Sequence, residues 1–255
     1  MTEPVSLIPL KLPRPVLSFH QLELTSRCDL RCVYCTNPKL ARLKTDMSWE
    51  HFQQSLDHVR YHVKNGTQTE LNLAGIGESF LHPLFADMCR DAREVLGDKI
   101  MIHVTTNGII ASDREDLIAH LAKHQIGMFV SLHRPEKAGK AIELAKKHGI
   151  FLSASSDPSL AATTWAGQVD WFHSADRNRP CPWIRSGRVM VRADGAVTTC
   201  CLDSGNNPDA VIGTVDDPVG SFYTKPYSLC ASCDQQIAVQ GYEQYPKPEK
   251  PLHVL

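Results

Sequence analysis

Three cysteines lie close together near the start of the chain, in the run Cys-Asp-Leu-Arg-Cys-Val-Tyr-Cys that spans Cys28, Cys32 and Cys35. Three thiolates on one short loop can ligate three irons of a cubic iron–sulfur cluster and leave the fourth iron open to another ligand. A zinc knuckle or a disulfide cluster is the alternative, but a structural zinc site is normally closed by a fourth ligand at pair-like spacing. The spacing therefore predicts a cluster with one open coordination position.

More cysteines follow in the last third of the chain: Cys181, the adjacent Cys200 and Cys201, and a Cys-Ala-Ser-Cys pair at Cys230 and Cys233. The residues between Val189 and Thr199 predict a hairpin that turns at Asp194-Gly195 and presents Cys200 at its end. Four thiolates from such positions can close a metal cage completely. A zinc ribbon built from four cysteines is the alternative.

Alternating elements must position these loops. Strand-like runs are expected near residues 19–25, 69–74, 100–105, 128–133, 150–155 and 168–173. Helices are expected between them, starting at about 49 after the cap Ser48 and then near 83–96, 113–124 and 136–148. Strands that alternate with helices in this way predict an α/β fold built on a parallel sheet.

The predicted strands carry polar side chains on the face opposite their aliphatic neighbours. These residues are Glu23, Asn72, His103, Ser131, His133, Ser153 and Asp170. A parallel strand buried on both faces would be apolar throughout, so this face is expected to line a polar cavity. The alternative for each residue is a hydrogen-bonded polar group with a structural role only.

The first cysteine run, with an aromatic residue before its last cysteine, resembles the radical S-adenosylmethionine (SAM) superfamily. In that family, the open iron chelates SAM and the reduced cluster cleaves it to a 5′-deoxyadenosyl radical, which abstracts hydrogen from a substrate. The resemblance implies a partial (β/α)6 barrel over residues 19–175, after an N-terminal extension at 1–18. It also implies an external one-electron reductant such as flavodoxin or ferredoxin.

The resemblance extends to residues that would bind SAM. Gly75, Gly77 and Glu78 resemble the family's Gly-Gly-Glu segment, which contacts the amino group of SAM, although Ser79 replaces the usual proline. A tight turn with an exposed glutamate is the alternative. Thr106, Asn107 and Ser131 follow the third and fourth strands, where the family contacts the ribose and carboxylate of SAM, and a plain Asn-Gly turn would also explain Asn107.

The second group of cysteines resembles the twitch module, a short form of the SPASM extension that holds one auxiliary 4Fe–4S cluster. This resemblance implies a module over residues 176–240, followed by a tail at 241–255. It implies two 4Fe–4S clusters in all. The expected auxiliary ligands are Cys181, Cys200, Cys230 and Cys233, with Cys201 spare.

Catalytic residues carry no motif of their own. His133 is the first candidate, because an imidazole titrates near neutrality, and Glu23 on the same polar face is the second. A hydrogen-bonding histidine without chemistry explains His133 equally well.

Composition limits the location and the partners. The chain has nine cysteines, no apolar stretch long enough to span a membrane and no basic, apolar leader, which together indicate a cytoplasmic protein that binds metal. A net charge of −1 gives no general attraction to nucleic acid. Local basic segments at 137–147 and 177–192 keep a nucleic-acid partner possible.

The expected reaction is hydrogen abstraction from a small-molecule or nucleoside-type substrate, followed by oxidation through the auxiliary cluster. Twitch-type alcohol dehydrogenases of aminoglycoside biosynthesis, which the chain resembles in length and layout, follow this course. A redox-neutral isomerase that acts on a modified nucleobase, such as hypermodified thymidine in phage DNA, is the alternative. Peptide maturation is a third option, and a non-enzymatic metal-binding adaptor would not need the segment from Gly75 to Glu78.

Overall fold

An eight-stranded, mostly parallel sheet organises the chain, with the strand order β6-β5-β4-β3-β2-β7-β8-β9. The computed structural model describes residues 14–132, 134–150, 152–155, 168, 181–205, 207–231 and 233. The parallel strands of the first part are β2 (Ser18–Leu22), β3 (Glu70–Leu73), β4 (Met101–Thr106), β5 (Gly127–Ser131) and β6 (Leu152–Ser155). The predicted α/β class is confirmed, whereas the strand expected at 168–173 falls outside the described residues except for residue 168.

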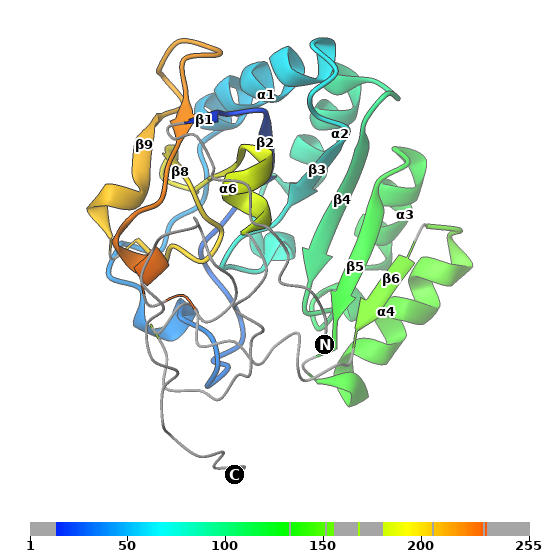
Figure 1. Ribbon diagram of the computed structural model, residues 1–255. Helices are drawn as coiled ribbons and strands as arrows, with labels where there is room; N and C mark the ends of the chain where they lie inside the picture. The colour runs from blue at the N-terminus through cyan, green and yellow to red at the C-terminus, as the bar shows by residue number, and fades with distance from the viewer. Residues whose placement is uncertain are drawn as a thin grey trace, which may run out of the picture.

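Helices connect these strands and cover one face of the sheet (Figure 1). They are α1 (Trp49–Lys64), α2 (Phe85–Leu96), α3 (Glu115–Lys123) and α4 (Pro135–Lys147). Ser48 caps α1 as predicted, because its hydroxyl accepts a hydrogen bond from the backbone N–H of His51 at 3.1 Å. Apolar side chains of the helices and strands form one buried core, in which Phe52 and Leu56 of α1 join Leu71 of β3.

The other face of the sheet carries the polar side chains that the alternation indicated. The residues that point to the helices are fully buried and apolar: Leu71, Leu73, Ile102, Val104, Met128 and Val130. The residues between them are only partly buried: Glu70, Asn72, His103, Thr105, Phe129 and Ser131. Thr105 donates a hydrogen bond to Asn72 at 3.1 Å across this face. His133 and Asp170, which were expected here too, lie outside the described residues.

The C-terminal part continues the same sheet. The predicted hairpin forms from β7 (Arg188–Val191) and β8 (Ala196–Thr198), and β9 (Val211–Thr214) follows β8 at the sheet edge. Strand β7 pairs in parallel with β2, so this hairpin lies directly beside the strand that leads into the first cysteine loop. Helix α6 (Pro182–Ser186) precedes β7, and β1 (Arg14–Pro15) forms a separate antiparallel pair with β10 (Tyr223–Thr224).

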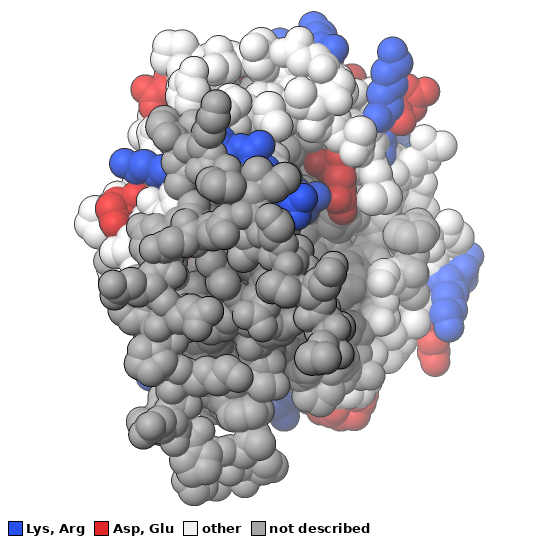
Figure 2. Space-filling model, viewed as in Figure 1, with Lys and Arg blue, Asp and Glu red and all other residues white. Residues whose placement is uncertain are grey.

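The described surface mixes positive and negative side chains. On the face that Figure 2 shows, lysines and arginines lie near acidic side chains and do not form a continuous positively charged patch. In the basic segment on α4, Lys147 pairs with Glu115 at 2.7 Å and Lys140 with Asp113 at 3.6 Å. This segment therefore resembles an ordinary solvated helix face. None of the helices within the described ranges has the length and apolar character needed to cross a membrane.

Candidate functional site

The first cysteine loop begins directly after the end of β2 and is half-buried. Backbone N–H groups point at two of its sulfurs: Leu30 donates to Cys28 Sγ and Asn37 to Cys35 Sγ, each at 3.4 Å. The side chain of Asn37 ties the loop down by donating to the carbonyls of Ser26 and Ile76, at 2.8 and 3.1 Å. In iron–sulfur sites, the ligating thiolates accept hydrogen bonds from backbone N–H groups of this kind.

The electrostatics of this loop suit a bound cation. Burial raises the pKa of the Cys28 thiol to about 11, and negative charge on Cys35 contributes to the rise. Burial also raises the pKa of Cys35, with a contribution from Cys32. The thiols therefore lie within electrostatic reach of one another, and a metal centre would favour the thiolate forms that burial disfavours.

The chemistry and position of the three thiols fit an iron–sulfur cluster, although their sulfurs are not already arranged around one metal position. Within the described residues, no three side chains of His, Cys, Asp or Glu are already arranged around one point as a metal ion requires. The three sulfurs nevertheless share one loop, with backbone donors aimed at Cys28 and Cys35. We take the donor set as fitting an iron–sulfur cluster on these grounds.

The two glycines of the predicted SAM segment have a steric role in the structure. A Cβ on Gly77 would lie 2.1 Å from the carbonyl oxygen of Thr25 and 2.6 Å from that of Arg27. A Cβ on Gly75 would lie 2.3 Å from the Glu23 side chain. Both glycines thus let the segment pack against the end of β2 and the start of the cysteine loop, a reason that the sequence did not reveal.

Glu78 is buried rather than exposed, which excludes a turn with a solvated glutamate. Its carboxylate accepts hydrogen bonds from the Thr106 hydroxyl at 2.8 Å, the Asn107 backbone N–H at 2.7 Å and the Phe80 N–H at 3.3 Å. Burial raises the pKa of Glu78 to about 7, against the opposing effect of these bonds. The structure therefore brings together the predicted SAM residues Glu78, Thr106 and Asn107.

Asn107 links this group to the cysteine loop. Its side-chain amide donates to Asp29 Oδ1 at 2.8 Å and lies 4.0 Å from Cys28 Sγ. Ser131 ends β5, the strand next to β4, and is partly exposed on the polar face. The predicted SAM residues and the first cysteines consequently occupy one end of the sheet.

Glu23 is placed where it cannot readily act on a substrate. It is fully buried, and both carboxylate oxygens are engaged by the Arg42 guanidinium at 2.8 and 2.7 Å. Backbone N–H groups of Ile76 and Ala193 complete its contacts, at 3.0 and 2.9 Å. We therefore replace the catalytic role expected for Glu23 with a structural one. Sequence reasoning missed Arg42, whose only signal was its position just after the cysteine loop.

The second group of cysteines also comes together. Burial raises the pKa of Cys181 to about 11 and that of Cys230 to about 12, and each is raised further by Cys200 and Cys233. A side-chain hydrogen bond to Cys201 helps to raise the pKa of Cys200, and Cys201 is not among the charges that act on Cys181 or Cys230. This arrangement favours Cys200 over Cys201 as the member of the set.

Tyr227, which sequence reasoning also missed, packs beside this second set. It belongs to a small buried cluster with Leu229 that contacts Cys200, Cys230 and Cys233. Its backbone N–H donates to Cys230 Sγ at 3.5 Å, and its side chain hydrogen-bonds to Cys200. The set is thus enclosed by apolar contacts and supplied with donors, as a closed iron–sulfur or zinc site requires.

Comparisons with known proteins show what this chain is similar to. The radical SAM superfamily model matches residues 22–147. The chain is 32% identical over 107 residues to the tungsten-containing aldehyde ferredoxin oxidoreductase cofactor-modifying protein of Pyrococcus furiosus, covering 42% of this chain and 28% of that protein. It is 30% identical over 136 residues to the PqqA peptide cyclase of Streptomyces rochei, covering 52% and 35% respectively. The chain thus spans about a third of the length of these curated relatives.

Solved structures share the fold. A crystal structure of BtrN in complex with AdoMet and 2-DOIA superposes with a TM-score of 0.65 and 19% identity, covering 81% of each chain. The structure of anSMEcpe with bound AdoMet and a peptide superposes with a TM-score of 0.54 and 16% identity, covering 80% of this chain and 79% of that one. At these identities the likeness establishes the architecture alone.

Proposed function

Because residues 22–147 form a domain of the radical SAM superfamily, we propose that the chain is an enzyme that cleaves SAM to a 5′-deoxyadenosyl radical. The radical then abstracts hydrogen from a small-molecule or nucleoside-type substrate. The observation that carries this proposal is the placement of Cys28, Cys32 and Cys35 beside the buried group of Glu78, Thr106 and Asn107.

In this proposal, the cysteines and Glu78 have different roles. Cys28, Cys32 and Cys35 would hold a 4Fe–4S cluster, which when bound and reduced supplies the electron for SAM cleavage. Glu78 fixes the backbone of Asn107 and the Thr106 hydroxyl, so these groups are oriented before SAM arrives. Glu78 is itself buried, so water has little access to its carboxylate.

We also propose that Cys181, Cys200, Cys230 and Cys233 hold an auxiliary 4Fe–4S cluster and that the net reaction is oxidation of the substrate. Four thiols close the cage, so this set would serve electron transfer rather than SAM binding. The convergence of these thiols around a buried tyrosine supports the assignment. Redox-neutral isomerisation of a modified nucleobase is the alternative outcome.

The comparisons leave a peptide as a second candidate for the substrate. One relative is named a peptide cyclase, and one similar structure holds a peptide, whereas the structure with the higher TM-score holds 2-DOIA. The polar, half-buried face of β3, β4 and β5 offers hydrogen-bonding side chains to a polar substrate, and on this ground we keep a small-molecule or nucleoside-type substrate as the first candidate.

Anaerobic reconstitution followed by iron and sulfide analysis tests the proposal. The wild-type chain should hold about eight of each, and a variant with Cys28, Cys32 and Cys35 replaced by Ala about four. With dithionite and SAM, the wild type should release 5′-deoxyadenosine and the triple variant should release none. Bound zinc without iron uptake, or 5′-deoxyadenosine release by the triple variant, would contradict the proposal.

A further inference from the structure

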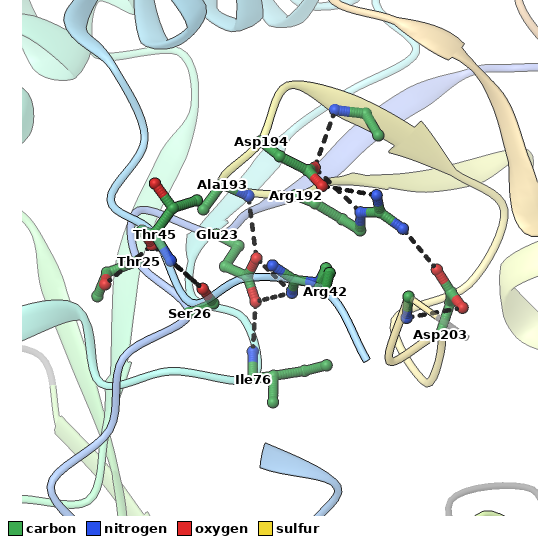
Figure 3. A network of polar contacts seen from close by, with 12 residues as sticks. Glu23, Thr25, Ser26, Arg42, Thr45, Ile76, Arg192, Ala193, Asp194 and Asp203 are labelled. Atoms are coloured by element: carbon green, nitrogen blue, oxygen red, sulfur yellow. Dashed lines mark hydrogen bonds and ion pairs between the residues drawn. The ribbon is translucent and has the colours of Figure 1, made fainter. Parts of the chain in front are cut away.

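The carboxylate of Glu23 joins three segments that are far apart in the sequence (Figure 3). It accepts hydrogen bonds from the Ile76 N–H, in the glycine segment, at 3.0 Å and from the Ala193 N–H, in the β7–β8 turn, at 2.9 Å. The guanidinium of Arg42, which follows the first cysteine loop, donates to both of its oxygens. One side chain thus touches the glycine segment, the stretch after the cysteine loop and the C-terminal hairpin.

Burial makes this junction costly to disturb. The Glu23 side chain is 0% exposed and that of Arg42 is 7% exposed, so the pair is isolated from solvent. Within the described part of the chain, Arg42 Nε and Nη1 have no hydrogen-bond partner. Glu23 is the ion-pair partner of Arg42, while Asp194 interacts with Arg42 only as a nearby charge. Removing one partner of a buried pair leaves an uncompensated charge.

The backbone on both sides is shaped to the pair. Gly75 leaves room for the Glu23 side chain, since a Cβ there would lie 2.3 Å from Glu23 Cγ. Gly205, close to Cys200 and Cys201 in the sequence, leaves room for Arg42, since a Cβ there would lie 2.7 Å from Arg42 Cδ. The loops that contain Gly75 and Gly205, one near each group of cysteines, therefore both pack closely against the Glu23–Arg42 ion pair.

The polar contacts continue from the hairpin to the second cysteine set. Arg192, next to Ala193, forms ion pairs with Asp194 at 2.7 Å and with the fully buried Asp203 at 3.3 Å. Asp203 accepts a hydrogen bond from the Gly205 N–H at 3.1 Å, and its own N–H donates to the Cys200 carbonyl at 3.3 Å. An unbroken series of contacts therefore runs from the glycine segment to Cys200.

We propose that Glu23 is a positioning residue that couples the SAM-binding segment to the second cysteine set. The carboxylate holds the Ile76 and Ala193 amides at fixed separation, so the glycine segment keeps its binding geometry only while the hairpin is docked. The SAM part of this inference rests on the proposed function, whereas the coupling of the two segments does not. Disturbance of the junction loosens both segments together.

Hydrogen exchange of the full-length, anaerobically purified protein tests the coupling without any assay of activity. In Glu23→Gln, the side-chain NH2 group faces the N–H donors that the carboxylate oxygens accepted from, so at least one of those hydrogen bonds is lost. Hydrogen exchange of the backbone amides around Ile76 and Ala193 should therefore speed up about ten- to a hundredfold. Glu143→Gln, the same change on the exposed surface of α4, is the control and should leave both segments unaltered. If Glu23→Gln speeds exchange in neither segment, or in only one, the coupling is overturned.

SAM affinity, measured by equilibrium dialysis, gives the second measurement. Glu23→Gln should bind SAM at least tenfold more weakly than the wild type, while the SAM affinity of Glu143→Gln should not change. Equal binding by wild type and Glu23→Gln overturns the inference. If the wild type itself binds no SAM, the proposed function fails, and the exchange data still decide the coupling.

A second variant keeps the test decisive if Glu23→Gln does not fold. The double variant Glu23→Leu, Arg42→Met replaces the ion pair by apolar groups, a change that buried pairs generally tolerate. It leaves no buried charge but also no acceptor for the Ile76 and Ala193 amides. Its two segments should exchange faster and its SAM affinity should fall, and wild-type behaviour would refute the proposal.

Discussion

A single methyl group added at Gly77 should separate the glycine segment from the first cysteine loop. The Gly77→Ala Cβ would lie 2.1 Å from the Thr25 carbonyl oxygen and 2.6 Å from that of Arg27, where a carbon and an oxygen normally stay about 3.3 Å apart. Both obstacles are backbone atoms, which cannot rotate away as a side chain does. The segment must therefore move by roughly 1 Å, and the 2.7 Å bond from the Glu78 N–H to the Arg27 carbonyl must lengthen or break.

The cost follows from these two effects. Overpacking of a well-filled interior costs about 1–3 kcal/mol, and a buried backbone donor left without its partner costs about 1–3 kcal/mol more. The sum, roughly 2–6 kcal/mol, corresponds to a fall in melting temperature of about 4–24 °C at 2–4 °C per kcal/mol for a chain of this size. SAM affinity should fall as well, because the displaced segment carries Glu78 away from Thr106 and Asn107.

Gly139→Ala supplies the matched control, with the opposite sign. Gly139 lies inside α4, and a Cβ there would meet nothing within 4 Å. Alanine in a helix interior is more stable than glycine by about 0.5–1 kcal/mol, so this variant should melt slightly higher and bind SAM normally. Thermal unfolding and SAM titration of both variants check the prediction. Gly77→Ala with wild-type stability and SAM affinity would refute the steric argument.

Three more outcomes are expected. Glu78→Gln cannot accept from both Thr106 and Asn107, so SAM affinity should fall about ten- to a hundredfold with iron content unchanged; an unaltered EPR response of the reduced protein to SAM would contradict this. A folded Cys230→Ala variant should still release 5′-deoxyadenosine but lose substrate turnover, and full turnover would show the second set to be dispensable. Burial lowers the pKa of His62 to about 4, so protonation of its unfolded form should reduce stability as pH falls from about 6.5 to 4, by up to about 1.4 kcal/mol per pH unit. His62→Phe should lessen this dependence, to which His20 also contributes, in urea unfolding at pH 7 and 5. An unchanged dependence of stability on pH would argue against a buried neutral His62.

The sequence was sufficient where the signal is local. The helices begin and end within a few residues of their predicted bounds, because apolar spacing and caps such as Ser48 are properties of short stretches. The alternation along β3, β4 and β5 likewise identified the polar face, since side chains two apart on a strand must share a side. The spacing of the first three cysteines needed no tertiary information at all.

The rest depended on contacts between distant parts of the chain. Glu23 was expected on the polar face, but it lies fully buried just past the end of β2. Its partner Ala193 is 170 positions away, so nothing near Glu23 in the sequence revealed that its oxygens are already engaged. Glu78 was expected to be free for a ligand, and its burial comes from strand β4 and the residues after it. Contacts with distant segments therefore bury both carboxylates and engage their oxygens, although the sequence around each suggested a free group.

The parallel pairing of β2 with β7 is the common cause of these contacts between distant segments. Because the two strands run side by side in the same direction, their carboxyl ends meet at one edge of the sheet, and the cysteine loop after β2 stands beside the hairpin turn after β7. A carboxylate just past the end of β2 can then reach the Ala193 amide, while β3 on the other side brings the glycine segment within reach. Strand order thus explains why Glu23, which belongs to neither cysteine group, bridges the two halves of the candidate site.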